Sequence, residues 1–132
     1  MPYEPGRGRT LLIPSGTQSD PNKKHLFVTL TGICPDGFLL LVSLSRVREG
    51  VHYDPACVFE PGEHRFVREK SFAAYRLARI EAAAKLIRHV EAWDFTPKDD
   101  MPLPLVERMC AGLHQSDFVA ARVLNYYRAL AE

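Results

Sequence analysis

The sequence predicts a small α+β protein, mainly β, in which a small antiparallel barrel is followed by C-terminal helices. Two apolar runs alternate like strands around a Pro-Asp-Gly turn, further short runs are broken by Pro-Gly, and the last third of the chain has helical periodicity. The 132 residues suffice for one domain with a core, and not for two. We expect residues 25–132 to form this domain.

Residues 1–24 are predicted to form an extended or partly disordered lead. They contain four prolines, three glycines, several basic residues and one short apolar patch at 11–13. A segment of this composition has little apolar surface to bury, so we interpret the lead as a solvated tail.

The clearest predicted element is an antiparallel hairpin. Residues 25–31 alternate between two faces, with aliphatic side chains on one of them, and residues 38–45 alternate in the same way. Pro35-Asp36-Gly37 stands between the two runs, and it favours a turn because proline fixes φ and glycine accepts positive φ. A short turn between two strands predicts that they pair with each other.

The middle of the chain is predicted to complete the barrel. Residues 56–60 and 64–67 are short apolar runs on either side of a Pro61-Gly62 turn, and both are expected to be strands. Residues 72–80 fit either a strand or a helix, and we assign them to the strand that closes the barrel. Residues 82–92 have high helix propensity and are predicted to be helical.

Two helices are predicted at the C-terminal end. Pro102 and Pro104 suit the first turn of a helix that ends near Gly112. Ser116 is expected to cap the last helix, with Asp117 in its first turn against the helix dipole.

Bulk properties restrict the class of protein. The formal net charge of +1 indicates no global attraction to nucleic acid or membrane, so any basic surface has to be local. Three widely separated cysteines and the lack of a secretory leader or an apolar run of membrane-spanning length predict a cytoplasmic protein.

Titratable side chains are concentrated between residues 52 and 75. His64 follows a turn, where an imidazole with an ordinary pKa near 6.5 could move a proton. His52, Asp54 and Cys57 are further groups of the types that bind zinc, but the spacing of the four matches no standard structural motif. The leading prediction therefore has no metal and no cofactor, and a metal-dependent hydrolase that uses His52, Asp54 and His64 is an alternative.

Basic and aromatic residues alternate in two places. They are 64–68, which contains Arg65 and Arg68, and Tyr75-Arg76. On a curved sheet such residues could bind phosphates and stack a base, as in proteins that bind single-stranded RNA. The alternative is a solvated rim with the aromatic rings in the core.

The order of features resembles the MazF/PemK/Kid family of growth-inhibitor toxins. Residues 25–31 and 37–45 look like the paired barrel strands of that family, and the stretch from Ser71 through Arg79 to Lys85-Leu86 looks like its late strand and helix. The family has an acidic residue shortly before the arginine, where this chain has Arg76, and residues 54–64 are an insertion that is not typical of it.

The resemblance implies an SH3-like barrel that forms a homodimer, cuts single-stranded RNA without a metal and is neutralised by an antitoxin-like protein. In this hypothesis His64 moves the proton and Arg79 and Arg46 hold the scissile phosphate. Tyr75 stacks a base and Ser71 orients the backbone. The remaining substrate-binding residues are Arg65 and Arg68.

A non-catalytic protein-interaction module of a bacterial or phage regulatory or defence system is the second interpretation. In it the Trp93-Asp94-Phe95 patch and the last helix dock a partner chain, because exposed aromatic side chains often anchor interfaces. Convergence of His64, Arg79 and Arg46 in one cleft would favour the enzyme over this module.

Overall fold

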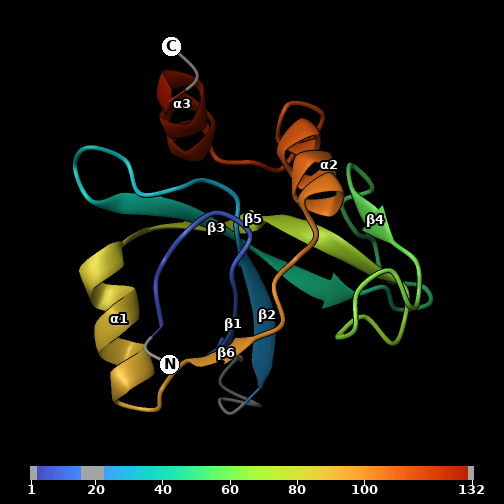
Figure 1. Ribbon diagram of the computed structural model, residues 1–132. Coiled ribbons are helices and arrows are strands. Elements are labelled where there is room, and N and C mark those ends of the chain that lie inside the picture. Colours follow the sequence, from blue (N-terminus) through green and yellow to red (C-terminus); the bar gives the residue numbers. More distant parts are fainter. Residues whose placement is uncertain (1–2, 16–22, 131–132) are drawn as a thin grey trace.

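The computed structural model describes residues 3–15 and 23–130 (Figure 1). In this part of the chain, six strands form one antiparallel sheet and three helices pack on it, so the protein is α+β and mainly β, as predicted. The elements in chain order are β1 (Thr10–Pro14), β2 (Lys24–Thr29), β3 (Phe38–Arg46), β4 (Val58–Phe59), β5 (Ser71–Ala82), α1 (Ala83–Glu91), β6 (Thr96–Lys98), α2 (Leu103–Leu113) and α3 (Ala121–Leu130).

The sheet is open within the described residues. Its strand order is β4-β5-β3-β2-β1-β6, and the edge strands β4 and β6 do not pair with each other. Every neighbouring pair is antiparallel. The prediction of a sheet that closes on itself is therefore not confirmed.

The predicted hairpin is confirmed. Strands β2 and β3 pair antiparallel, with Val28 opposite Val42. Gly37 has a φ of +89° at the turn, and its backbone N–H donates to the carbonyl oxygen of Cys34 at 2.8 Å. A residue with a Cβ would be strained at this φ, which explains why the turn contains a glycine.

The interpretation of the lead as a solvated tail is wrong for strand β1. Thr10, Leu11 and Ile13 are buried, and β1 lies inside the sheet with β2 on one side and β6 on the other. The apolar patch at 11–13 is the interior of this strand. The part of the predicted lead at 16–22 lies outside the described residues.

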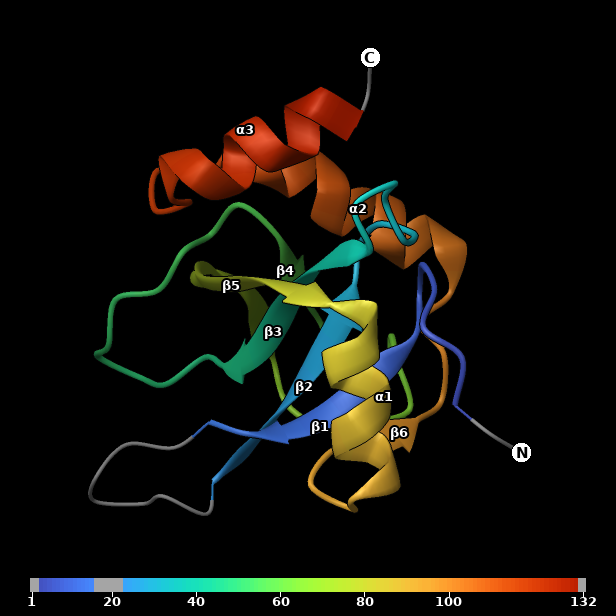
Figure 2. The same ribbon diagram turned by 90° about the vertical axis from the view of Figure 1, so that its left-hand side faces the viewer.

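Helices cover both faces of the sheet (Figures 1 and 2). On the face that we call the α2–α3 face, alternate residues of β2, β3 and β5 pack against Val106, Met109, Leu113 and Val123. On the opposite face, the α1 face, Leu86 packs with the other set of alternate residues and with Phe95. The continuous apolar run in β3 is buried because it supplies both faces.

A bulge interrupts strand β5. Ala74 pairs with Ser43 and Arg79 pairs with Leu41, so the four residues 75–78 lie opposite Val42 alone. Ala73 before the bulge and Ile80 after it both point to the α2–α3 face, so odd-numbered side chains give way to even-numbered ones. The bulge leaves two consecutive side chains, Arg76 and Leu77, exposed.

Three further predictions need correction. Only Val58–Phe59 of the run at 56–60 is a strand, and residues 64–67 form a turn closed by the Val67 N–H on the His64 carbonyl oxygen. The last helix begins at Ala121. The Ser116 hydroxyl accepts the Phe118 N–H in the loop before this helix, so Ser116 is not its N-cap. The strand from 71 and the helices near 83 and 103 are confirmed.

Candidate functional site

A long open groove runs along the end of the sheet at which β2 begins and β3 ends. Its volume is about 930 Å³. Its walls come from β2, from the end of β3 and the loop at 48–53, from the turn at 66–69 and from the first half of β5. We call it the basic groove after its cationic side chains, which are Lys23, Lys24, Arg46, Arg48 and Arg76.

Positive charge in the basic groove is almost uncompensated. Glu69 is the one carboxylate among the described residues that line it, and it pairs with Arg46 at 2.7 Å. The other four cationic side chains form no ion pair with any described residue. Because the whole chain carries a formal charge of only +1, the groove concentrates positive charge on one surface.

Exposed apolar side chains lie among these cations. Val51, Phe66 and Leu77 line the groove and are all exposed. The Tyr53 ring packs against Phe72 with the ring centroids 5.4 Å apart, and both rings also line the groove. A surface that combines aromatic rings with unpaired cations suits a chain of bases joined by phosphates.

His25 lines the groove with one nitrogen of its imidazole in a short hydrogen bond. Ser15 Oγ lies 3.1 Å from the Ile13 carbonyl oxygen and 2.6 Å from His25 Nδ1. Nε2 of His25 has no hydrogen-bond partner among the described residues. A neutral imidazole that carries its hydrogen on Nδ1 accepts a proton at Nε2.

The surroundings of His25 favour the neutral imidazole. Partial burial lowers its pKa, and the positive charges of Lys23, Arg48 and Arg79 lower the pKa further. A neutral imidazole beside several cations combines a proton acceptor with groups that bind an anion.

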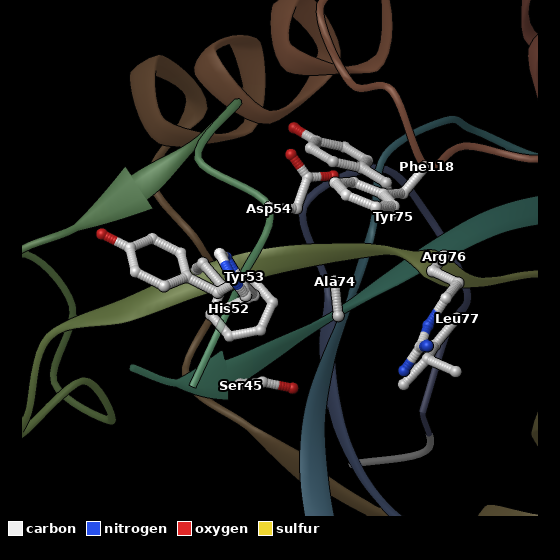
Figure 3. A pocket seen from close by; sticks show the side chains of 10 residues that line it. Ser45, His52, Tyr53, Asp54, Ala74, Tyr75, Arg76, Leu77 and Phe118 are labelled. Atoms are coloured by element: carbon white, nitrogen blue, oxygen red, sulfur yellow. The ribbon is translucent and has the colours of Figure 1, made fainter. Parts of the chain in front are cut away.

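A smaller cavity, the side pocket, opens from the groove near the β5 bulge (Figure 3). Its volume is about 270 Å³. It is lined by Ser45, His52, Tyr53, Asp54, Phe72, Ala74, Tyr75, Arg76, Leu77 and Phe118. Six of these residues, Ser45, His52, Tyr53, Phe72, Arg76 and Leu77, also line the basic groove, so the two cavities are continuous.

Asp54 is buried at the wall of the side pocket and holds two loops together. Its Oδ1 accepts the Ala56 N–H at 3.0 Å, and its Oδ2 accepts the hydroxyl of Ser116 from the connection between α2 and α3. These bonds fix the 52–54 segment beside the start of the last helix and keep a carboxylate at the wall.

His64 lies apart from the groove and is hydrogen-bonded at both ring nitrogens. Nε2 lies 3.1 Å from the Asp99 carbonyl oxygen and 3.2 Å from that of Asp100, and Nδ1 accepts the Phe66 N–H at 3.0 Å. The side chain is 5% exposed. The ring therefore pins the turn at 64–67 to the segment after β6, and both of its nitrogens are used in doing so.

The other predicted catalytic residues approach the groove from two directions. Arg46 lines it directly at the end of β3. Arg79 lies on the α1 face, where its guanidinium stacks over Phe27 at 4.8 Å from the ring centroid, and it is close enough to His25 to lower the imidazole pKa. The structure thus places Arg46 in the same groove as His25 and Arg79 near His25, and it does not bring His64 there.

The predicted substrate-binding residues are also separated. Ser71 lines the groove, with its hydroxyl donating to the Glu69 carbonyl oxygen. Tyr75 is fully buried, its hydroxyl donates to the Met109 carbonyl oxygen at 2.6 Å, and burial raises its pKa. Arg65 pairs with Asp99 at 3.1 Å, and Arg68 is exposed beyond the lining residues of the groove.

The four potential metal ligands have different environments. Asp54 and His64 are hydrogen-bonded to other groups of the protein. His52 is exposed in the groove, and burial raises the pKa of the Cys57 thiol. Within residues 3–15 and 23–130, no three His, Cys, Asp or Glu side chains are grouped so that they could hold a metal ion.

Sequence reasoning missed His25, Lys23 and Arg48 as site residues. They lie outside the 52–75 segment and come together only because β2 and β3 pair, which places the start of one strand beside the end of the other. The paired register of the predicted hairpin was the one signal in the sequence that could have indicated this.

None of the helices in the described part of the chain is long and apolar enough to cross a membrane. Comparison with protein-family models finds no match, and comparison with curated proteins finds no relative.

Proposed function

We propose that the protein binds single-stranded RNA in the basic groove and cleaves it without a metal. The observation that carries this proposal is the combination, in one groove, of four cations without an ion pair to any described residue, exposed aromatic and aliphatic side chains, and a histidine whose Nε2 has no hydrogen-bond partner among the described residues. Cations bind the phosphates, rings stack the bases and the imidazole accepts a proton.

In this proposal His25 takes the role that the sequence analysis gave to His64. Nε2 of His25 takes the proton from a ribose 2′-hydroxyl, and the 2′-oxygen then attacks the adjacent phosphorus. The P–O5′ bond breaks, water protonates the departing 5′-oxygen, and a 2′,3′-cyclic phosphate remains. Arg48 and Arg79 offset the negative charge that develops on the phosphate oxygens.

A fluorescently labelled single-stranded RNA incubated with the protein in EDTA tests the cleavage. We expect fragments with cyclic phosphate ends, and a rate for His25→Ala at least about 100-fold lower, as for the loss of a general base. Wild-type protein that neither degrades RNA nor slows the growth of cells that express it would contradict the cleavage.

Binding is tested separately by charge reversal. Arg48→Glu should weaken RNA binding at least about tenfold and lower the slope of log affinity against log salt concentration by about 1–2, because a phosphate contact is lost and a repulsion is added. Arg128→Glu is the matched control, since Arg128 is exposed on α3 outside both cavities. Equal effects of the two reversals would count against the groove.

The resemblance to the growth-inhibitor toxins supplies further parts of the proposal. They are an SH3-like arrangement of the bent sheet, assembly as a homodimer, and an antitoxin-like protein that neutralises the activity. Light scattering of the purified protein tests the dimer, with a monomer at all concentrations as the outcome against it.

A second candidate function, a non-catalytic interaction module, is favoured by Trp93. This side chain is 91% exposed and lies beside a hollow lined by Tyr3, Val90 and Phe95. Exposed tryptophans are frequent anchors of protein interfaces. If this module is the function, Trp93→Ala removes the effect of the protein on growth and Arg48→Glu does not.

A further inference from the structure

We propose that the side pocket binds one unstacked guanine base of the RNA whose phosphates lie in the basic groove. This inference rests on the proposed function and adds to it a base preference. It concerns residues of the 52–54 segment and of the connection between α2 and α3, which both line the pocket (Figure 3).

The size and the walls of the pocket suit a single base. Its volume of about 270 Å³ is just below the roughly 300–1,000 Å³ of sites for larger small molecules. Four aromatic rings line it, those of Tyr53, Phe72, Phe118 and the fully buried Tyr75. Phe118 is 52% exposed, so a ring that could be buried in the core instead faces the cavity. A base stacked on these rings would cover this apolar surface.

The route into the pocket leads from the groove. Arg76 and Leu77 line both cavities, because the bulge in β5 exposes two consecutive side chains at their junction. A nucleotide with its phosphate on the groove cations can therefore turn its base into the pocket. Proteins that recognise single-stranded RNA commonly bind bases that are turned out of the strand in this way.

The polar groups at the wall select among the bases. An ionised carboxylate accepts about four hydrogen bonds, and the structure gives Asp54 two, from Ala56 and Ser116. The remaining acceptor positions need donors, and guanine presents two adjacent donors, N1–H and N2–H₂, on one edge. Arg76 supplies donors for the O6 and N7 acceptors of the same base. Uracil and adenine each offer a carboxylate one donor group on this edge.

Fluorescence anisotropy with labelled octamers tests the base preference. The probes are an oligouridine and the three variants with one central guanine, adenine or cytosine, all with 2′-O-methyl riboses that cannot be cleaved. We expect the guanine probe to bind wild-type protein about tenfold more tightly than the other three. Asp54→Asn should reduce this advantage to about twofold or less.

Two further variants separate recognition from folding. Ser116→Ala removes a hydrogen bond from Asp54 without removing the carboxylate, so it should keep the guanine preference. Phe118→Ala removes an exposed ring and should reduce the preference, and it tests the pocket if Asp54→Asn does not fold. Loss of the preference in Ser116→Ala alone would contradict a direct contact with Asp54.

The outcomes distinguish this inference from the proposed function. If all four probes bind with equal affinity, or if another base is preferred, the pocket does not select guanine while RNA binding in the groove stands. If none of the four probes binds, and a single-stranded RNA with ordinary riboses does not bind either, the proposed function fails together with the inference.

Discussion

Tyr75 and Arg79 lie on opposite faces of the sheet although they are four residues apart on the same strand. Tyr75 is buried against α2, with its hydroxyl on the Met109 carbonyl oxygen, and Arg79 stacks over Phe27 on the α1 face. In a regular strand, residues separated by an even number share a face. The bulge at residues 75–78 changes this parity. Tyr75 is buried between the sheet and α2, whereas Arg79 lies near His25.

His64→Ala should lower the free energy of unfolding by about 1–3 kcal/mol, since it removes a buried ring together with its hydrogen bonds to backbone groups. Those groups are the Phe66 N–H and the carbonyl oxygens of Asp99 and Asp100. Urea denaturation measures the change. Arg65→Ala is the control, because its exposed ion pair with Asp99 contributes less than about 1 kcal/mol. A variant that is as stable as wild type but no longer cleaves RNA would show that His64 is catalytic after all.

The lowered pKa of His25 predicts how stability depends on pH. In the unfolded chain the imidazole has a pKa of about 6.5, and in the folded protein burial and the cations around it lower the pKa. As the pH falls through about 6.5, the unfolded state therefore binds a proton that the folded state does not yet bind, and the protein loses stability. Above that pH His25 imposes no such penalty.

His25→Gln should consequently lose less stability than wild type on acidification from neutral pH. Denaturation curves at a series of pH values measure the difference, and NMR should find that His25 titrates at lower pH than a histidine in an unfolded chain. His114→Gln, an exposed position outside both cavities, is the control. Parallel curves for His25→Gln and wild type would contradict the shift.

Gly112→Ala should destabilise the protein even though it lies inside helix α2. In a helix that tolerates it, this change is favourable by about 1 kcal/mol. Here a Cβ would overlap the Tyr75 hydroxyl and lie 2.9 Å from Tyr75 Cζ, in a packed core. We expect a net loss of about 1–3 kcal/mol in thermal or urea unfolding.

Tyr75→Phe tests the cause of that loss. Because it removes the oxygen that the new Cβ would meet, the double variant should lose less stability than the two single variants together. Strict additivity would mean that Gly112 is needed for another reason.

Trp93→Gly should raise the free energy of unfolding. Trp93 is the residue after the C-cap of α1 and has a φ of +65°. Glycine is the usual residue at such a left-handed helix end, and the Trp93 side chain is almost fully exposed. Relief of the left-handed conformation is worth about 1 kcal/mol. Trp93→Ala keeps a Cβ and should not gain this stability. A glycine variant less stable than the alanine variant would contradict the argument and would indicate that the indole stabilises the fold.

The parts of the fold that the sequence predicted are those in which local pattern decides the structure. The hairpin of β2 and β3 follows from alternation and a turn glycine, and the start of α2 follows from its prolines. Strand β1 was missed because five residues among prolines and glycines carry too little pattern. Its burial depends on β2 and β6 on either side of it.

The candidate site was predicted less well, because its residues come together only through the pairing register of β2 and β3. The sequence analysis placed Arg46 and Arg79 in it, and the structure has Arg46 in the groove and Arg79 near His25. The antiparallel pairing of two strands brings Lys23 and Arg48 to one groove, which only the register of the predicted hairpin could have indicated. His64 is a histidine beside a turn, which in a sequence suggests a catalytic group. Only the hydrogen bonds of its buried ring to the Asp99 and Asp100 carbonyl oxygens indicate a structural role.

The position of β1 also determines when the sheet can be completed during synthesis. β1 is near the beginning of the chain, yet one of its two neighbours, β6, is made only after β5 and α1. A nascent chain that has left the ribosome as far as β5 therefore presents one side of β1 as an unpaired edge. Such edges pair readily with other chains, so truncation before Thr96 should convert this protein into an aggregating one.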